Sequence, residues 1–312
     1  MSFRFYGHNC FEFRHKSNIL LTDPWFSREG AFFGSWHQYP PNSHLFKKII
    51  EETHLKNNYY IYISHDHQDH FDLNSLTKLS KNINIIIPKF RDPFFKNKID
   101  ELGFKFKELV DQEELIIENA FKIKMFISDI GGHADSALMI KSKDFVFFNQ
   151  NDCKIFDRLR NIKEKITFYS VQFSGANWHP PCFIFDEQKK LSITKMKVEN
   201  KLLNVINAMK VLKPRFLIPS AGPAVFPFLE KSLSLGQNNI FIHQDYLSKR
   251  LTKSDIKNVI YLKPGDIFSE NKKTPISAPN ERDLEELKKG VIDVWKNLKV
   301  SFKKSKLILK YK

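Results

Sequence analysis

The stretch YISHDHQDHFD, residues 62–72, places three histidines and two aspartates within six positions directly after an apolar run. Imidazole nitrogens and carboxylate oxygens are good ligands for zinc, iron or manganese. His65 and His67 are two apart and share a face in extended backbone, whereas Asp69 and His70 follow where the chain turns. The spacing favours two adjacent metal positions over the alternative, a polar turn with its histidines in solvent.

The residues around this loop indicate a strand-to-helix connection. YYIYIS, residues 59–64, is an apolar strand candidate, and leucines recur at helical spacing over residues 73–79. INIIIPKF, residues 83–90, then predicts a buried strand. The loop therefore sits at the end of a strand, a rigid place from which several side chains can point at one ion.

The rest of the chain predicts a mixed α/β fold with no internal repeat and no linker. Strand candidates include residues 115–128 and 258–266, and a helix is predicted over 198–212. Another helix is expected to begin at Asn280. We expect one domain over residues 1–270, followed by a basic C-terminal extension over 271–312.

Composition sets limits on the class of protein. The 312 residues are 42% hydrophobic and include 30 phenylalanines, enough for a substantial core. No run approaches the ~20 apolar residues of a membrane span, and the N-terminus lacks the apolar segment of a signal peptide. Three scattered cysteines offer no disulfide framework, so we expect a soluble protein of the cytoplasm.

The net charge of +15 has two interpretations. Excess Lys and Arg favour anionic partners, but the basic residues are spread along the chain and can equally be a solvated surface. We expect a small anionic substrate and no dedicated nucleic-acid surface.

Two further residues lie at the ends of predicted strands. His133 follows paired glycines and precedes an apolar strand, and Asp152 lies at the end of the apolar strand candidate FVFFNQ, residues 145–150. Four ligands from one loop cannot complete two metal positions, so other segments have to contribute. Their order along the chain makes both residues candidate ligands.

These motifs resemble the metallo-β-lactamase superfamily, which implies a four-layer αββα sandwich. GHNCFEFRHKSNILLTDPWF, residues 7–26, resembles the branch that contains N-acylphosphatidylethanolamine phospholipase D and the ascorbate-phosphate lactonase. The resemblance implies that the metal ligands and their neighbours are the following: His65, His67, Asp69, His70 and His133 as ligands, Asp152 as a metal-bridging carboxylate, and Asp23 and His8 beside the metals. One or two divalent ions are implied, with zinc preferred and iron or manganese as alternatives.

Several stretches also resemble the metallo-β-lactamase-like part of CMP-N-acetylneuraminate hydroxylase, among them HADSALMI and VLKPRFLIPSAGPAVF. Two departures matter. Hydrolases of the superfamily carry a last metal-binding histidine where this chain has Ser220, Ala221 and Gly222. The hydroxylases also carry a Rieske domain, which needs Cys-x-His and Cys-x-x-His pairs that are absent from this sequence.

The main hypothesis is a metal-dependent hydrolase in which metal-bound hydroxide attacks a phosphorylated or nucleotide-linked substrate. Asp69 is a ligand of the second metal or, without that metal, the residue that orients the water and takes its proton. The alternative is a component of an oxygenase system that hydroxylates an N-acyl sugar nucleotide with a separate Rieske or reductase partner. His37, Trp178 and His179 are weaker candidates, the histidines for the missing ligand and the tryptophan for stacking on substrate.

Overall fold

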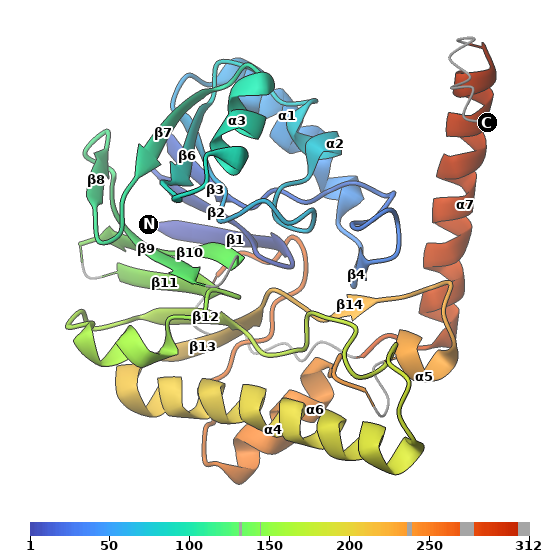
Figure 1. Ribbon diagram of the computed structural model, residues 1–312. Coiled ribbons are helices and arrows are strands. Elements are labelled where there is room, and N and C mark those ends of the chain that lie inside the picture. The colour runs from blue at the N-terminus through green and yellow to red at the C-terminus, as the bar shows by residue number, and fades with distance from the viewer. Residues whose placement is uncertain (131–132, 144, 236–238, 269–277, 305–312) are drawn as a thin grey trace.

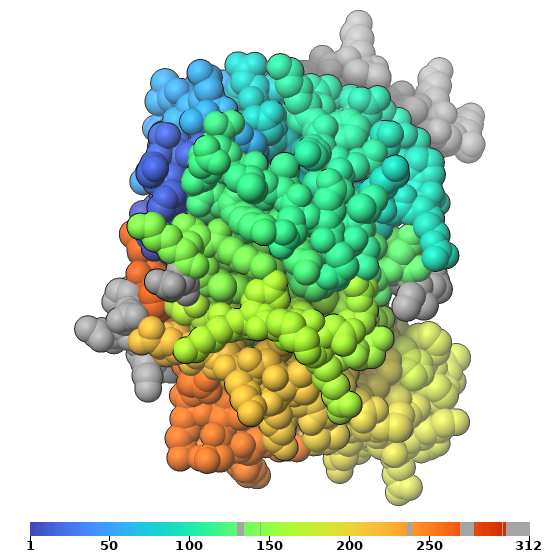
Figure 2. All heavy atoms as spheres, turned by 90° about the vertical axis from the view of Figure 1, so that its left-hand side faces the viewer, coloured from blue at the N-terminus to red at the C-terminus, as the bar shows by residue number. Residues whose placement is uncertain are grey.

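A computed structural model describes residues 1–130, 133–143, 145–235, 239–268 and 278–304. Within these residues two six-stranded sheets face each other, and helices cover both outer surfaces (Figure 1). Seen from the side, colours run from blue and cyan at the top through green to gold and orange at the bottom (Figure 2). The two halves of the chain therefore build the two halves of the sandwich, and the predicted four-layer αββα fold is confirmed.

The N-terminal half forms the first sheet, in the order β1-β2-β3-β5-β6-β7. Its strands are β1 Ser2–Gly7, β2 Cys10–His15, β3 Asn18–Thr22, β5 Tyr59–Tyr62, β6 Asn84–Pro88 and β7 Lys105–Leu109. Its outer face is covered by α1 Phe46–Leu55, α2 Leu73–Leu76 and α3 Phe94–Glu101. Ile49 of α1 and Ile99 of α3 are fully buried against Ile61 and Ile85 of the sheet.

The second sheet has the order β13-β12-β11-β10-β9-β8. Its strands are β8 Glu114–Ile117, β9 Phe121–Ile130, β10 His133–Ser142, β11 Phe145–Asn151, β12 Phe168–Gln172 and β13 Phe216–Ser220. The outer face is covered by α4 Glu187–Leu212 and α6 Gln244–Lys253. Two short 3-10 helices, Ser43–Leu45 and Phe156–Asn161, and α5 Lys231–Ser234 complete the connections.

Three local predictions need correction. Residues 115–128 form two strands, because Glu118 and Asn119 adopt positive φ angles of 46° and 54° and turn the chain back as a hairpin. Residues 258–266 form no strand, since only an isolated bridge from Val259 to Leu217 adds to β13. The helix predicted over 198–212 begins much earlier, at Glu187, where the side chain of Asp186 accepts a hydrogen bond from the Lys189 amide.

The core between the sheets is rich in phenylalanine. The ring of Phe147 lies 4.9–5.2 Å from those of Phe3, Phe11 and Phe13, and all four side chains are buried. Burying one such side chain stabilises the fold by about 1.5–3 kcal/mol. These contacts connect the two sheets and fix the distance between their edges.

Parallel strands bring the candidate site residues to one edge. β3, β5 and β6 are parallel neighbours in the first sheet, and β11, β12 and β13 in the second. The carboxyl ends of parallel strands meet at the same sheet edge, where ligands bind in open α/β sheets. Asp23 follows β3, the His65–His70 loop follows β5, and Asp152 follows β11. The turn between β1 and β2 contributes His8 to the same edge.

The helix α7, Glu281–Lys304, begins where the sequence predicts, because Asn280 and Asp283 exchange side-chain-to-backbone hydrogen bonds. It stands beside the short sheet of β4 His37–Gln38 and β14 Ala224–Val225 (Figure 1), and its buried residue Val291 lines a cavity together with His37 and Gln38. Among the described residues, no helix is long and apolar enough to cross a membrane.

We predict that Phe147→Ala lowers the free energy of unfolding by about 3–5 kcal/mol, because it leaves a cavity between the sheets. Urea unfolding followed by circular dichroism measures this loss. Phe33→Ala is the matched control, because the Phe33 side chain is 96% exposed and its removal leaves no cavity. Equal destabilisation by the two substitutions would contradict the packing described here.

Candidate metal centre

The loop after β5 is held in place by hydrogen bonds at both of its ends. At its start, the Ser64 amide donates to Asp23 Oδ1 over 2.8 Å. At its end, Asp72 caps α2 and also accepts from the Phe26 and Ser27 amides, at 3.2 and 3.0 Å. The loop is therefore pinned to the segment after β3, and its side chains have little freedom to reorient.

The first group of candidate ligands is His65, His70 and Asp152. One ligand atom from each lies within 4.8 Å of the others. His65 Nε2 is 3.8 Å from Asp152 Oδ2, and His70 Nε2 is 3.5 Å from Asp152 Oδ1. His67 is not part of this group, but its Nδ1 is hydrogen-bonded to His65 Nε2 over 2.8 Å. Two ring nitrogens that face each other and a nearby carboxylate suit a shared cation.

The second group is His8, Asp69 and His70, again with one ligand atom from each within 4.8 Å. His8 Nε2 is 3.1 Å from Asp69 Oδ2, and His70 Nε2 is 3.8 Å from the same oxygen. His70 thus stands between the two groups, and its neighbour Asp152 reaches towards it from the second sheet. The arrangement corresponds to two adjacent positions.

Unpartnered polar atoms test whether these residues fit a metal. His8 Nε2, Asp69 Oδ1, His70 Nε2 and Asp152 Oδ1 are all buried, and none has a hydrogen-bond partner. A buried polar atom without a partner costs about 1–3 kcal/mol, and more when it is charged. Three of these atoms, His8 Nε2, His70 Nε2 and Asp152 Oδ1, come from three segments and belong to the two ligand groups, so the residues fit one or two divalent ions.

Burial and mutual charge shift the pKa values of this cluster. Burial lowers the pKa of His65, but the carboxylates of Asp135 and Asp152 outweigh it and raise that pKa to about 9. The pKa of His70 is also raised well above its usual value, because Asp152 and Asp69 outweigh its burial. Conversely, burial would raise the pKa of Asp69, but His70 holds it below its usual range. The cluster therefore requires positive charge, which protons or a metal can supply.

Asp23 orients His70 from the side away from the candidate ions. Its Oδ2 is 2.7 Å from His70 Nδ1 and also accepts from Ser64 Oγ and Asn9 Nδ2, at 2.7 and 2.6 Å. A carboxylate on Nδ1 fixes the tautomer that leaves Nε2 free for a metal. Asp23 thus contacts a candidate ligand directly, and its own partners Ser64 and Asn9 are supports that the sequence did not suggest.

Asp135 has the same relation to His65 and was missed in the sequence. Its Oδ1 is 3.2 Å from His65 Nδ1 and accepts a 2.6 Å hydrogen bond from the Ser136 amide. Burial raises the pKa of Asp135 to about 6, although His65 opposes the shift. The signal available in the sequence was an acidic residue two positions after His133.

His133 begins β10, and its backbone pairs with Ile130 of β9. Its side chain lies outside the described part of the structure, so its predicted role as a ligand stays a prediction. The paired β10 and β11 nevertheless bring this end of β10 close to Asp152, because Asn151 Nδ2 donates to Ser136 O over 2.8 Å.

Backbone strain is concentrated around the site. His8, Asp23, Asn151 and Ala221 have positive φ angles of 47°, 35°, 45° and 49°. Each such residue costs on the order of 1–3 kcal/mol, and these conformations are typical of functional sites. They come from the β1–β2 turn and from the ends of β3, β11 and β13, the four segments that meet at this edge.

The weaker candidates lie apart from the ligand groups. Trp178 packs on Trp36, Phe226 and Phe241, which makes it part of an aromatic cluster. The His179 ring packs edge-to-face against Phe183, with ring centroids 4.8 Å apart.

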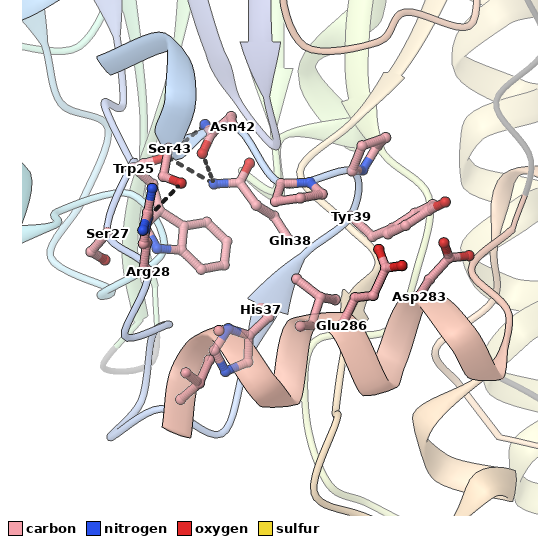
Figure 3. Close-up of a pocket in the computed structure, with 15 residues that line it drawn as sticks. Trp25, Ser27, Arg28, His37, Gln38, Tyr39, Asn42, Ser43, Asp283 and Glu286 are labelled. Atoms are coloured by element: carbon pink, nitrogen blue, oxygen red, sulfur yellow. Dashed lines mark hydrogen bonds between the residues drawn. The ribbon is translucent and has the colours of Figure 1, made fainter. Parts of the chain in front are cut away.

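His37, on β4, is buried with Nε2 3.1 Å from Gly34 O. It lines a separate cavity of about 450 Å³, together with Tyr39 and with Asp283 and Glu286 of α7 (Figure 3). Neither His37 nor His179 contributes to a described ligand group.

Lys201 of α4 is a further residue that the sequence did not single out. Its Nζ donates to Gln172 Oε1 at the end of β12. Burial lowers the pKa of Lys201 to about 8, against the opposing effect of Asp152 and Asp135. Lys201 is therefore a held positive charge that interacts electrostatically with both carboxylates.

Known proteins match this chain in sequence and in fold. Residues 2–147 match the family model described as the beta-lactamase superfamily domain. A Mycobacterium tuberculosis protein provisionally named a Rieske 2Fe-2S iron–sulfur protein is 28% identical over 230 residues, which are 70% of this chain and 43% of that protein. Cytidine monophosphate-N-acetylneuraminic acid hydroxylase from Macaca mulatta is 24% identical over 232 residues, which are 69% of this chain and 37% of the hydroxylase. The chain thus spans less than half the length of these relatives.

Two solved structures show the same fold at low sequence identity. CmlA, a diiron β-hydroxylase from Streptomyces venezuelae, superposes with a TM-score of 0.56 at 14% identity. The superposition covers 86% of this chain and 53% of the CmlA chain. A metallo-hydrolase from Ignicoccus hospitalis superposes with a TM-score of 0.55 at 12% identity. The superposition covers 86% of this chain and 98% of the hydrolase. The sequence match over residues 2–147 confirms the resemblance to the metallo-β-lactamase superfamily, and the two solved structures confirm the fold.

We predict that Asp135→Ala weakens zinc binding by about 10- to 100-fold, because His65 loses the carboxylate that fixes its ring and its tautomer. Competition with a chromophoric chelator measures the Kd. Asp157→Ala removes an exposed aspartate of the adjoining 3-10 helix and should leave the Kd unchanged. An unchanged Kd for Asp135→Ala would show that His65 needs no such support.

Proposed function

We propose that this chain is a metal-dependent hydrolase of a small anionic substrate, phosphorylated or nucleotide-linked. The observation that carries the proposal is the position of Asp152 between His65 and His70, with a different oxygen towards each ring. A carboxylate in that position can serve two adjacent ions. Such ions would supply hydroxide at neutral pH, since metal binding lowers the pKa of water from ~15.7 to about 7.

The protein residues have separate roles in this proposal. His65, His67, His70 and Asp152 would hold the ions, with His133 as a further proposed ligand. Asp69 is kept ionised by its imidazole neighbours, and its Oδ1 has no hydrogen-bond partner. That oxygen is available to bind an ion or, where the second position is empty, to take a proton from water. Asp23 keeps the proton on His70 Nδ1, so that Nε2 faces the reacting space.

An anionic substrate is supported by Lys201 and by the net charge of +15. Lys201 lies on the α4 side of the site, within the field of Asp152 and Asp135. Lys197, one turn away, donates to His179 O over 2.9 Å and to Asn177 Oδ1 over 3.2 Å, which ties the Trp178 loop to α4. Lys197 therefore holds this loop to α4, and Lys201 is the amine of α4 whose charge Asp152 and Asp135 influence.

The second candidate function is an oxygenase component that acts on an N-acyl sugar nucleotide. It is favoured by the names of the sequence relatives, which include Rieske and hydroxylase proteins. Here Cys10 and Cys153 are buried free thiols and Cys182 is exposed, and none belongs to a Cys-x-His pair. Under this proposal, the electrons would come from a redox group that these three cysteines do not bind.

One experiment separates the two functions. The full chain, loaded in turn with Zn²⁺ and Fe²⁺, is assayed with a nucleotide sugar and with phosphate mono- and diesters, with and without dioxygen and a reductant. We expect hydrolysis with Zn²⁺ that needs neither dioxygen nor a reductant. We also expect kcat/KM to fall by about 10³-fold or more in the His65→Ala/His67→Ala variant. Turnover only with iron, dioxygen and reductant would overturn the hydrolase in favour of the oxygenase.

We predict that the KM for the anionic substrate rises by about 10-fold as pH increases through about 8, because Lys201 loses the charge that pairs with the substrate. The sign follows from the lowered pKa: the amine is charged below pH 8 and neutral above it. The charged groups around it are Asp152 and Asp135, which favour the proton, and Lys154, which opposes it.

Lys201→Arg tests this assignment, because guanidinium stays charged throughout the range and the KM should then lose its inflection. Lys201→Met should have a high KM at every pH. An inflection near pH 8 that persists in both variants would assign the titration to another group.

A further inference from the structure

The turn between β1 and β2 holds His8 in a fixed, strained position. Gly7 has a φ of +118°, and a Cβ there would lie 2.4 Å from Gln38 Oε1, so the turn needs glycine. His8 follows with a φ of +47°, a conformation that costs a non-glycine residue energy. Chain geometry alone does not require a histidine at this place, and its side chain points into the metal centre.

The His8 ring is buried and clamped, yet its Nε2 has no hydrogen bond. Trp25 stands edge-on to the ring with centroids 5.1 Å apart, and His70 lies 5.0 Å away on another side. Nε2 is 3.1 Å from Asp69 Oδ2, within ion-pair distance but without the geometry of a hydrogen bond. His70 Nε2 is equally without a partner and lies 3.8 Å from the same Asp69 oxygen, so one ligand atom from each of the three residues faces one space.

His8 also lies beside the segment where the expected last histidine is missing. The Ala221 amide donates to His8 O over 2.9 Å, which joins the β1–β2 turn to the end of β13. Ser220, Ala221 and Gly222 carry no side chain suited to bind a metal. The imidazole of His8 therefore occupies the neighbourhood that these residues leave without a nitrogen ligand.

We propose that His8 is a ligand of the second metal position, together with Asp69, His70 and Asp152, and that it takes the place of the missing histidine. Two imidazoles and two carboxylates form a donor set suited to zinc, iron or manganese. The assignment rests on the metal-dependent function proposed above and adds a specific ligand to it. It changes the expected role of His8 from a neighbour of the metal to a residue in direct contact with it.

The test counts ions on the full-length chain. Protein stripped with a chelator is titrated with Co²⁺, and bound metal is measured by elemental analysis and by the visible absorption of the ion. We expect wild type to bind two ions, and His8→Ala to bind one tightly with the second weakened at least about 100-fold. Added imidazole should restore the second ion to His8→Ala.

A second variant separates metal binding from support of Asp69. His8→Gln keeps an N–H donor that can reach Asp69 but removes the imidazole, so a ligand role predicts the same loss as in His8→Ala. His37→Ala and His179→Ala, the other histidines considered for the missing ligand, should retain both ions. Thermal unfolding of each stripped variant checks that it is folded.

Each other outcome has a definite meaning. Two ions with unchanged affinity in His8→Ala, or full binding in His8→Gln, would overturn the ligand role. Wild type that binds a single ion, with the same affinity in His8→Ala, would also overturn it and leave the metal-dependent function intact. Wild type that binds no ion would overturn the proposed function itself, a result that differs visibly from failure of the His8 assignment alone.

Discussion

The burial of carboxylates and imidazoles together at one edge of the sandwich constrains everything else in the site. Asp69, Asp152 and Asp135 lie beside His65 and His70 with little access to water, and several of their polar atoms have no partner. Removing a charge from water costs several kcal/mol unless an opposite charge compensates it. The cluster is therefore stable only with added positive charge, which is what a divalent ion or ring protons provide.

The fold meets this constraint by rigid support from both sheets. The phenylalanine core between the sheets fixes the distance across which Asp152 reaches the loop after β5. Asp23 and Asp135 each fix one histidine ring through its Nδ1, one from each sheet. Left-handed backbone at the ends of β3, β11 and β13 and in the β1–β2 turn directs the chain inwards. Strain at these four places is opposed by well-ordered packing elsewhere, as in other functional sites.

The sequence predicts the parts of the site that are local in the chain. His65, His67, Asp69 and His70 are recognisable because their spacing after an apolar strand is itself the motif. Asp135 and Lys201 could not be found in this way, because their roles depend on pairing between β10 and β11 and on the docking of α4. The wrong prediction of a strand over residues 258–266 has the same cause. Whether an apolar run pairs as a strand depends on its tertiary neighbours, and here only Val259 forms a bridge, to Leu217 of β13. Asp23 was found only through resemblance to a family.

The most direct test of a cation in this cluster is anomalous diffraction at the zinc edge from crystals grown with Zn²⁺. A peak within about 2.0–2.2 Å of His65 Nε2 and an Asp152 oxygen is predicted, accompanied by a second on the side of His8 and Asp69. Absence of any peak between the two sheets, with the same side chains in place and hydrogen-bonded only to water, would contradict the account.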